Sequence, residues 1–141
     1  MKKVLVIMLT ALLPLACAAV LIAAEQRPAI YLEPSDGFET YLAAAMKAKK
    51  VPVIVVEQRE RAEYILKTTL LYQEPTTLQK IAWRGGITNA AAILLHAQSG
   101  KEVWKYDVRK PGNKKKSAAE AIAKHLAGNI ARIVTESRSG K

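Results

Sequence analysis

Only a few side chains in this sequence fall into patterns that chemistry requires. Glu33, Asp36 and Glu39 lie close together, and two facing carboxylates can perform acid–base catalysis. Asp36 and Glu39 also stand just before a helical pattern with the spacing of a capping box, which accounts for both of them without catalysis. His96 and His125 are the only histidines, and neither has partners at metal-ligand spacing. We expect His96 to lie in a strand and His125 to be solvated.

Nucleophile and nucleotide motifs are also missing from the sequence. Ser35, Ser99 and Ser117 each have a sufficient role in a turn or a cap, and no base accompanies them in the sequence. The Arg84-Gly85-Gly86 stretch lacks the spacing of either nucleotide-binding fingerprint. We therefore expect no catalytic residue, no metal site and no cofactor.

Two polar stretches offer binding chemistry instead. Residues 73–86 form the least regular part of the chain, and they hold an aromatic side chain next to an arginine. One interpretation makes this pair a small contact platform; the other packs Ile81 and Trp83 beneath the loop as a local cluster. A second loop carries a run of three lysines. The candidate contact surface comprises Trp83, Arg84, Lys114, Lys115 and Lys116.

Residues 1–24 have the pattern of an export signal. A basic start is followed by a long apolar run and then by small residues, with candidate cleavage sites after Ala18 and after Ala24. Two alternatives remain open. Residues 4–24 are long enough to stay as an uncleaved membrane anchor, and Cys17 could be acylated as in a lipoprotein.

The net charge limits the classes of partner, and the single cysteine limits disulfide formation. The chain has 22 Lys and Arg against 12 Asp and Glu, a net charge of +10, and losing Lys2 and Lys3 with the signal leaves +8. Such a domain attracts anions at long range. Outside the cytoplasm those are lipid head groups, cell-wall polymers or acidic proteins, and nucleic acid is not expected. Cys17 is the only cysteine, so a mature chain without it has no disulfide.

Residues 25–137 have the length of one domain. Its central element is a predicted hairpin, residues 87–109, which turns at Ser99-Gly100. In the second strand of this hairpin, Trp104, Tyr106 and Val108 are expected to face a core. Three further strands are expected at residues 29–33, 51–56 and 64–72. The β-branched run 51–56 is typical of a strand that is buried on both faces or belongs to a parallel pair.

Two helices are expected, and capping boxes mark their starts. One begins at Asp36 with Glu39, and the other begins at Ser117 with Glu120; residues 138–141 form a frayed tail. The predicted fold is a single α/β (α+β) domain with a mixed sheet of about five strands. Its element order is β-α-β-β-β-β-α, with both helices on one face and the signal helix in front. The last helix carries one apolar stripe: Ala119, Ile122, Ala123, Leu126, Ile130, Ile133 and Val134.

Four segments of the chain, residues 31–45, 50–53, 61–66 and 117–126, resemble a group of small exported bacterial proteins of unassigned activity. More loosely, the chain resembles the amino-terminal domain of TolB, the periplasmic domain of the curli secretion channel and the penicillin-binding-protein activator lipoproteins. The resemblance implies an α/β module that binds other envelope proteins. Its motifs are structural, so no functional residue carries over.

The sequence thus favours a periplasmic or secreted, non-catalytic accessory module that contacts another envelope protein. The first alternative is a basic domain that binds an anionic membrane or cell-wall polymer. The second is a small hydrolase without a recognisable motif, for which Glu33, Asp36 and His96 are the candidates.

Overall fold

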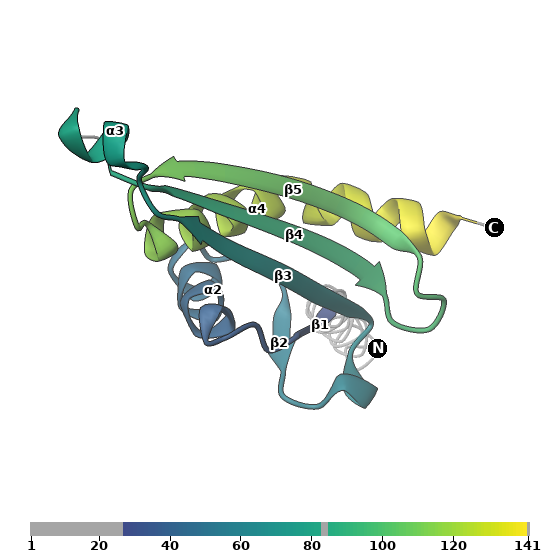
Figure 1. Ribbon diagram of the computed structural model, residues 1–141. Helices are drawn as coiled ribbons and strands as arrows, with labels where there is room; N and C mark the ends of the chain where they lie inside the picture. Colours follow the sequence, from purple (N-terminus) through teal and green to yellow (C-terminus); the bar gives the residue numbers. More distant parts are fainter. Residues whose placement is uncertain (1–26, 83–84, 141) are drawn as a thin grey trace, which may run out of the picture.

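The computed structural model describes residues 27–82 and 85–140. They form one mixed five-stranded sheet in the order β2-β1-β3-β4-β5, with β1 parallel to β2 and β3, and with β3, β4 and β5 antiparallel (Figure 1). The predicted fold class and element order are confirmed, whereas the predicted signal helix lies outside the described residues. The elements are β1 (Ala29–Leu32), α2 (Phe38–Ala48), β2 (Ile54–Val56), the 3-10 turn η1 (Arg59–Arg61), β3 (Tyr64–Gln73), α3 (Thr77–Ile81), β4 (Ile87–His96), β5 (Glu102–Pro111) and α4 (Lys115–Ser139).

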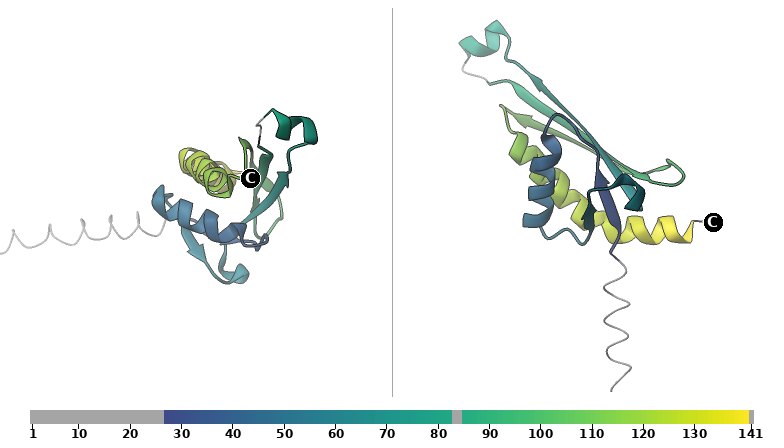
Figure 2. Two further views of the ribbon diagram at one scale, coloured as in Figure 1. Left: turned by 60° about the vertical axis from the view of Figure 1, so that its left-hand side comes forward. Right: turned by 90° about the horizontal axis from the view of Figure 1, so that it is seen from below.

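The long helices α2 and α4 cover one face of the sheet, and the core lies between them and the strands (Figure 2). The apolar stripe predicted for the last helix is confirmed, because all seven of its residues are buried. Tyr64 and Leu66 of β3 and Leu94 of β4 are the inward-facing side chains that meet these helices. Ile65 is buried as well, but it alternates with them and lies outside the core cluster, on the open face of the sheet.

The predicted hairpin is confirmed. β4 and β5 are each ten residues long and are paired at nine positions, and Gly100 in their turn has φ 68°, a value that glycine adopts without strain. Trp104 and Val108 face the core and are buried, and Tyr106 between them is half-buried.

The first helix begins differently from the capping-box prediction. Asp36 is not the N-cap: it has φ 49°, Gly37 is the N-cap residue, and the helix starts at Phe38. Glu39 still stabilises this start, because its carboxylate accepts a 2.8 Å hydrogen bond from the backbone N–H of Ser35. The same bond, with the backbone N–H groups of Glu39 and Gly37, lowers the pKa of Glu39.

The last helix also begins earlier than predicted. α4 starts at Lys115 with Lys114 as its N-cap residue, so the capping box assigned to Ser117 and Glu120 is wrong. At its other end, α4 continues to Ser139, into the segment 138–141 for which we expect a frayed tail. Arg138 there donates two hydrogen bonds to Glu63, which precedes β3, and this pairing raises the pKa of Arg138.

Of the two alternatives predicted for the β-branched run 51–56, the structure has the parallel pair and not the burial on both faces. Only Ile54–Val56 form a strand, which pairs in parallel with β1 as expected. β2 is an edge strand, however, and Ile54 and Val55 are 49% and 45% exposed, so the strand is not buried on both faces. Among the residues that the structure describes, no helix combines the length and the apolar character needed to cross a bilayer.

A basic end of the domain as candidate contact surface

The register of the three long strands determines which loops meet. Gln73 at the end of β3 lies opposite Ile87 at the start of β4, and Ile87 lies opposite Pro111 at the end of β5. The β3–β4 connection and the β5–α4 connection therefore leave the sheet at the same end. The backbone N–H of Gly112 donates a hydrogen bond to the carbonyl of Gly86, which ties the two connections together.

Thr88 fastens the start of α4 to the sheet. It is the one buried polar residue of the described core, and its hydroxyl donates to the carbonyl of Gly112 at 2.6 Å. The same oxygen accepts from the backbone N–H of Lys114 at 3.0 Å. The Thr88 hydroxyl thus provides a hydrogen-bond partner for both backbone groups. α4 begins beside β4 without a capping side chain of its own.

Gly86 makes the close approach of the two connections possible. A Cβ at this position would lie 2.2 Å from the carbonyl oxygen of Gln73 and 2.7 Å from the hydroxyl of Tyr72. Gly112, on the other connection, has φ 77°. Both glycines are therefore required by the local backbone, one by space and the other by conformation.

The irregular stretch 73–86 contains a short helix that sequence analysis missed. α3 is held by a capping box in which Thr76 accepts from the N–H of Gln79 and Gln79 accepts from the N–H of Thr76. The Thr-x-x-Gln pattern was the available signal for it. Leu78 and Ile81 are 79% and 71% exposed, so the prediction that Ile81 packs beneath the loop is wrong. Trp83 and Arg84 lie outside the described residues.

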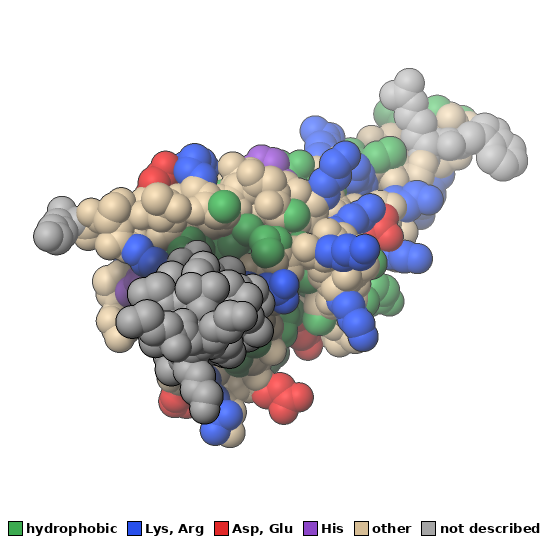
Figure 3. Space-filling model, turned by 180° about the vertical axis from the view of Figure 1, so that it is seen from behind, with side chains coloured by type: hydrophobic (Ala, Val, Ile, Leu, Met, Phe, Trp, Pro, Cys, Tyr) green, Lys and Arg blue, Asp and Glu red, His purple; other side chains and the backbone are tan. Residues whose placement is uncertain are grey.

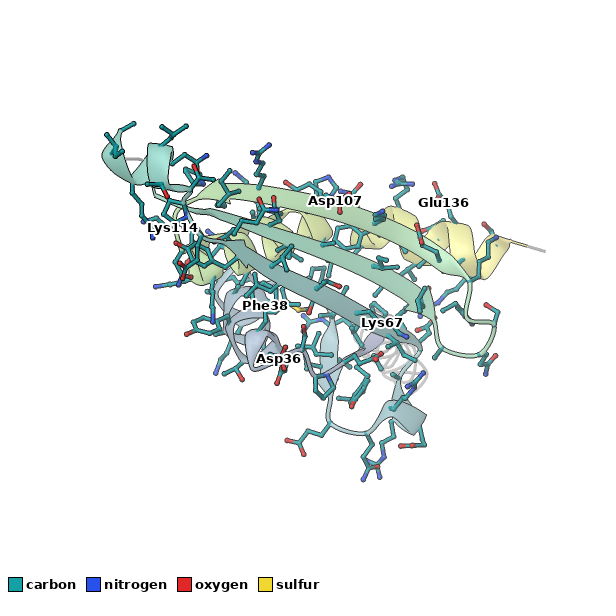
Figure 4. All side chains as sticks on the ribbon, in the orientation of Figure 1. Asp36, Phe38, Lys67, Asp107, Lys114 and Glu136 are labelled. Atoms are coloured by element: carbon teal, nitrogen blue, oxygen red, sulfur yellow. The ribbon has the colours of Figure 1, made fainter. Side chains whose placement is uncertain are left out.

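Cationic side chains lie on this short helix and at the adjoining ends of β5 and α4. We call the described members the basic end, and the ribbon places Lys114 at the end of the sheet that carries α3 (Figure 4). Seen from the helix-covered side, lysines and arginines gather toward the same end (Figure 3). None of these side chains forms an ion pair with another described residue. The basic end comprises Lys80, Arg109, Lys110, Lys114, Lys115 and Lys116, of which all but the half-buried Lys110 are exposed.

The structure does not bring the three candidate catalytic residues together. Glu33 pairs with Lys67 at 3.6 Å, on the open face of the sheet. His96 lies opposite Tyr64 in the β3–β4 register, with the rings 5.6 Å apart and edge to face, so it points to the helix-covered side. Asp36 lies in the loop before α2. Residues on opposite faces of a sheet cannot share a reacting group.

The prediction that His125 is solvated is wrong. It is half-buried and stacks on Tyr106, with ring centroids 3.9 Å apart and planes inclined by 7°. Trp104 also stacks on Tyr106, with the ring centroids 6.1 Å apart. The three rings join α4 to β5, and this packing role explains the histidine.

A cavity of about 520 Å³ lies at the end of the sheet away from α3. It separates the β4–β5 turn from the last turns of α4, and its walls include His96, Lys101, Glu102 and Glu136. Across residues 27–82 and 85–140, no three His, Cys, Asp or Glu side chains are grouped as metal ligands would be.

Both edges of the sheet are protected against pairing with another strand. β5 carries Lys105, Arg109 and a terminal Pro111, and its pairing with β4 is interrupted by an irregularity at Leu94 and Leu95. β2 at the other edge has only three residues. Strand addition is therefore disfavoured, and the projecting basic end is the more accessible feature for contact.

Comparison with known proteins places the fold. No family model matches the chain, and a search of curated proteins finds no match. Among solved structures, protein XCC0632 from Xanthomonas campestris, of the family DUF330, is similar at 12% identity and a TM-score of 0.51, over 82% of this chain and 89% of that one. The PelC dodecamer from Paraburkholderia phytofirmans matches at 17% identity and a TM-score of 0.49, over 72% of this chain and 88% of a PelC chain.

TolB is also among the similar structures. TolB from Acinetobacter baumannii matches at 10% identity and a TM-score of 0.47, over 72% of this chain and 28% of the TolB chain. At these identities the likeness concerns the fold.

Proposed function

We propose that the protein is a non-catalytic accessory module of the cell envelope that binds another envelope component through its basic end. The location rests on the predicted export signal in residues 1–24 and on the resemblance of the sequence to exported proteins. The observation that carries the contact surface is the joining of the α3 connection and the lysine loop by Gly86, Thr88 and Gly112.

The electrostatics of this end support binding by charge. Three consecutive lysines, 114–116, stand at the first turn of α4, where the helix dipole offers them no stabilisation. Without acidic partners among the described residues, their charge is directed to solvent. An anionic partner would relieve this repulsion, and the attraction would weaken with salt over the Debye length of about 8 Å at physiological ionic strength.

Two kinds of partner could supply the negative charge that the basic end attracts. The sequence resemblance implies another envelope protein. The exposed apolar side chains Leu78 and Ile81 give a specific reason to consider an anionic lipid surface.

Photo-crosslinking in the bacterium that encodes the chain tests the proposed function. A crosslinking amino acid is placed at Lys116 in the basic end, and at Gln98 in the β4–β5 turn at the opposite end of the sheet. Adducts that form from position 116, and that fall as salt is raised in isolated envelopes, are expected. Adducts from position 98 alone, or equal adducts from both positions, would contradict the proposal.

The compartment is tested on the same cells. Mass spectrometry of the purified chain defines the mature N-terminus, and cleavage after Ala18 or Ala24, or recovery from the membrane with residues 4–24 present, is expected. Recovery of the intact chain from the cytosol, Met1 included, would overturn the envelope location.

A further inference from the structure

We propose that the basic end docks on an anionic phospholipid surface, with Leu78 and Ile81 entering the lipid interface while the surrounding lysines contact the phosphate groups. This inference rests on the proposed function, because it names the occupant of the same surface.

The apolar component is a pair of aliphatic side chains on one small knob. Leu78 and Ile81 stand three residues apart in α3, a spacing that places both on one side of a helix. At 79% and 71% exposed, they are the two most exposed large apolar side chains of the described chain. The capping box of Thr76 and Gln79 holds this turn in shape, so little ordering is needed when the side chains are buried.

The shape of this end favours a lipid surface over a protein pocket. α3 projects beyond the ends of the strands as a convex tip (Figures 1 and 2). A membrane interface accepts a convex apolar tip with flanking cations without needing a complementary recess. Lysine side chains suit this role, because their long stems can follow apolar contacts while their ammonium groups stay with the phosphates.

The charge component lies on α3 itself and at the adjoining β5–α4 junction. Lys80 stands between Leu78 and Ile81 in the sequence of α3. Lys110 lies near the end of β5, and lysines 114–116 lie at the N-cap and first turn of α4, next to the connection that the Gly86–Gly112 hydrogen bond holds in place. Basic clusters of this size next to apolar residues bind anionic lipids in preference to zwitterionic ones. The expected ligand is therefore the phosphate-bearing surface of a lipid such as phosphatidylglycerol.

The N-terminal segment does not explain binding at this end. β1 begins beside the start of β3, since Ile30 lies opposite Tyr64, so Arg27 enters the domain at the end of the sheet away from α3. A lipid contact made by the basic end is thus distinct from any contact made by residues 4–24, and a local reporter can separate them.

The test uses a solvatochromic dye on the full chain. With Cys17 replaced by serine, the dye is attached at Ala82→Cys, beside α3, or at Gln98→Cys in the opposite turn. Vesicles contain either phosphatidylethanolamine and phosphatidylglycerol, or phosphatidylcholine alone. A blue shift of the dye at position 82 on the anionic vesicles only, with no shift at position 98, is expected.

Two variants with matched charge loss test the mechanism. Lys114→Gln/Lys115→Gln/Lys116→Gln should raise the lipid concentration for the half-maximal shift by about 100-fold, whereas Arg59→Gln/Arg61→Gln/Lys101→Gln, at the opposite end, should change it less than about twofold. Leu78→Ser/Ile81→Ser should abolish the blue shift. Circular dichroism confirms that each variant folds.

The alternatives give different results. An absent shift, an equal shift on phosphatidylcholine, or equal effects of the two triple variants would overturn the lipid inference. Protein adducts from position 116 in cells together with an absent shift would leave the proposed function standing and identify a protein as the partner. If position 116 forms adducts with neither a protein nor a lipid, both the lipid inference and the proposed function are wrong.

Discussion

The hydroxyl of Thr88 lies 3.0 Å from the backbone nitrogen of Lys114 and accepts its hydrogen bond, although the two residues are 26 positions apart. The same oxygen donates to the carbonyl of Gly112 at 2.6 Å. Through this single buried side chain, Lys114, the last residue of the connection between β5 and α4, is fixed against β4. The position of the basic end is therefore determined by the core as well as by the loop.

Thr88→Val should destabilise the domain by about 1–3 kcal/mol, because the isosteric side chain leaves the N–H of Lys114 and the carbonyl of Gly112 without a partner. Urea unfolding measures the change. Thr135→Val is the matched control, since the Thr135 hydroxyl bonds only to the carbonyl of Ala131 on the exposed side of α4. Equal losses for the two variants would show that Thr88 does not have this role.

Two glycine-to-alanine substitutions should have opposite signs. Gly86→Ala introduces a Cβ 2.2 Å from a backbone oxygen and should lower stability, with a shift of the α3 connection. Gly128 lies within α4 with no atom near its would-be Cβ, so Gly128→Ala should raise stability by about 0.5–1 kcal/mol. Thermal unfolding of both variants measures the signs, and a stabilising Gly86→Ala would contradict the close approach.

The hydrogen bond from Ser35 to Glu39 should make part of the stability depend on pH. The pKa of Glu39 is lowered in the folded chain, so its contribution is present above the unfolded-state pKa of about 4.5 and is lost as the pH falls through the lower folded-state value. Glu39→Gln should therefore unfold at a lower temperature than the parent at pH 7, and the two should converge as the pH falls below the folded-state pKa of Glu39. A difference that stays constant across this range would exclude the linkage.

The buried stripe of α4 should dominate the packing energy of that helix. Leu126 is fully buried, and Leu126→Ala should cost about 2–5 kcal/mol. Lys124→Ala, two positions earlier on the exposed side, should change stability by less than about 0.5 kcal/mol. Chemical denaturation provides both values, and similar costs would mean that α4 does not pack on the sheet in solution as described.

The parts of the fold that depend on repeating patterns could be predicted from the sequence. The stripe from Ala119 to Val134 and the alternation of Trp104, Tyr106 and Val108 are averaged over many residues, so burial follows from periodicity. Helix starts depend on one or two groups and were less predictable. Ser117 has the right spacing for a cap, yet α4 starts at Lys115, and the preceding Lys114 is bonded to Thr88, 26 residues earlier in the chain.

The contact surface shows the same division. Sequence analysis could select the lysine run and the irregular loop by composition. Their proximity depends on the register of β3, β4 and β5, which no local pattern contains. α3 was missed although Thr76 and Gln79 have capping-box spacing, because five residues are too few for a helical period to be recognised. The exposure of Ile81 followed from that helix. That Trp83 and Arg84 contribute to the surface stays a prediction.

The most direct test of the basic end as the contact surface is the labelling rate of single cysteines in cells and in purified protein. A maleimide that cannot cross the cytoplasmic membrane is applied to cells that carry Cys17→Ser with Ala82→Cys or Gln98→Cys. We predict that position 82 reacts at least about fivefold more slowly in cells than in the purified chain, while position 98 reacts at the same rate in both. Equal rates at position 82 in cells and in the purified chain would contradict a contact at the basic end, and no labelling at either position would contradict the envelope location.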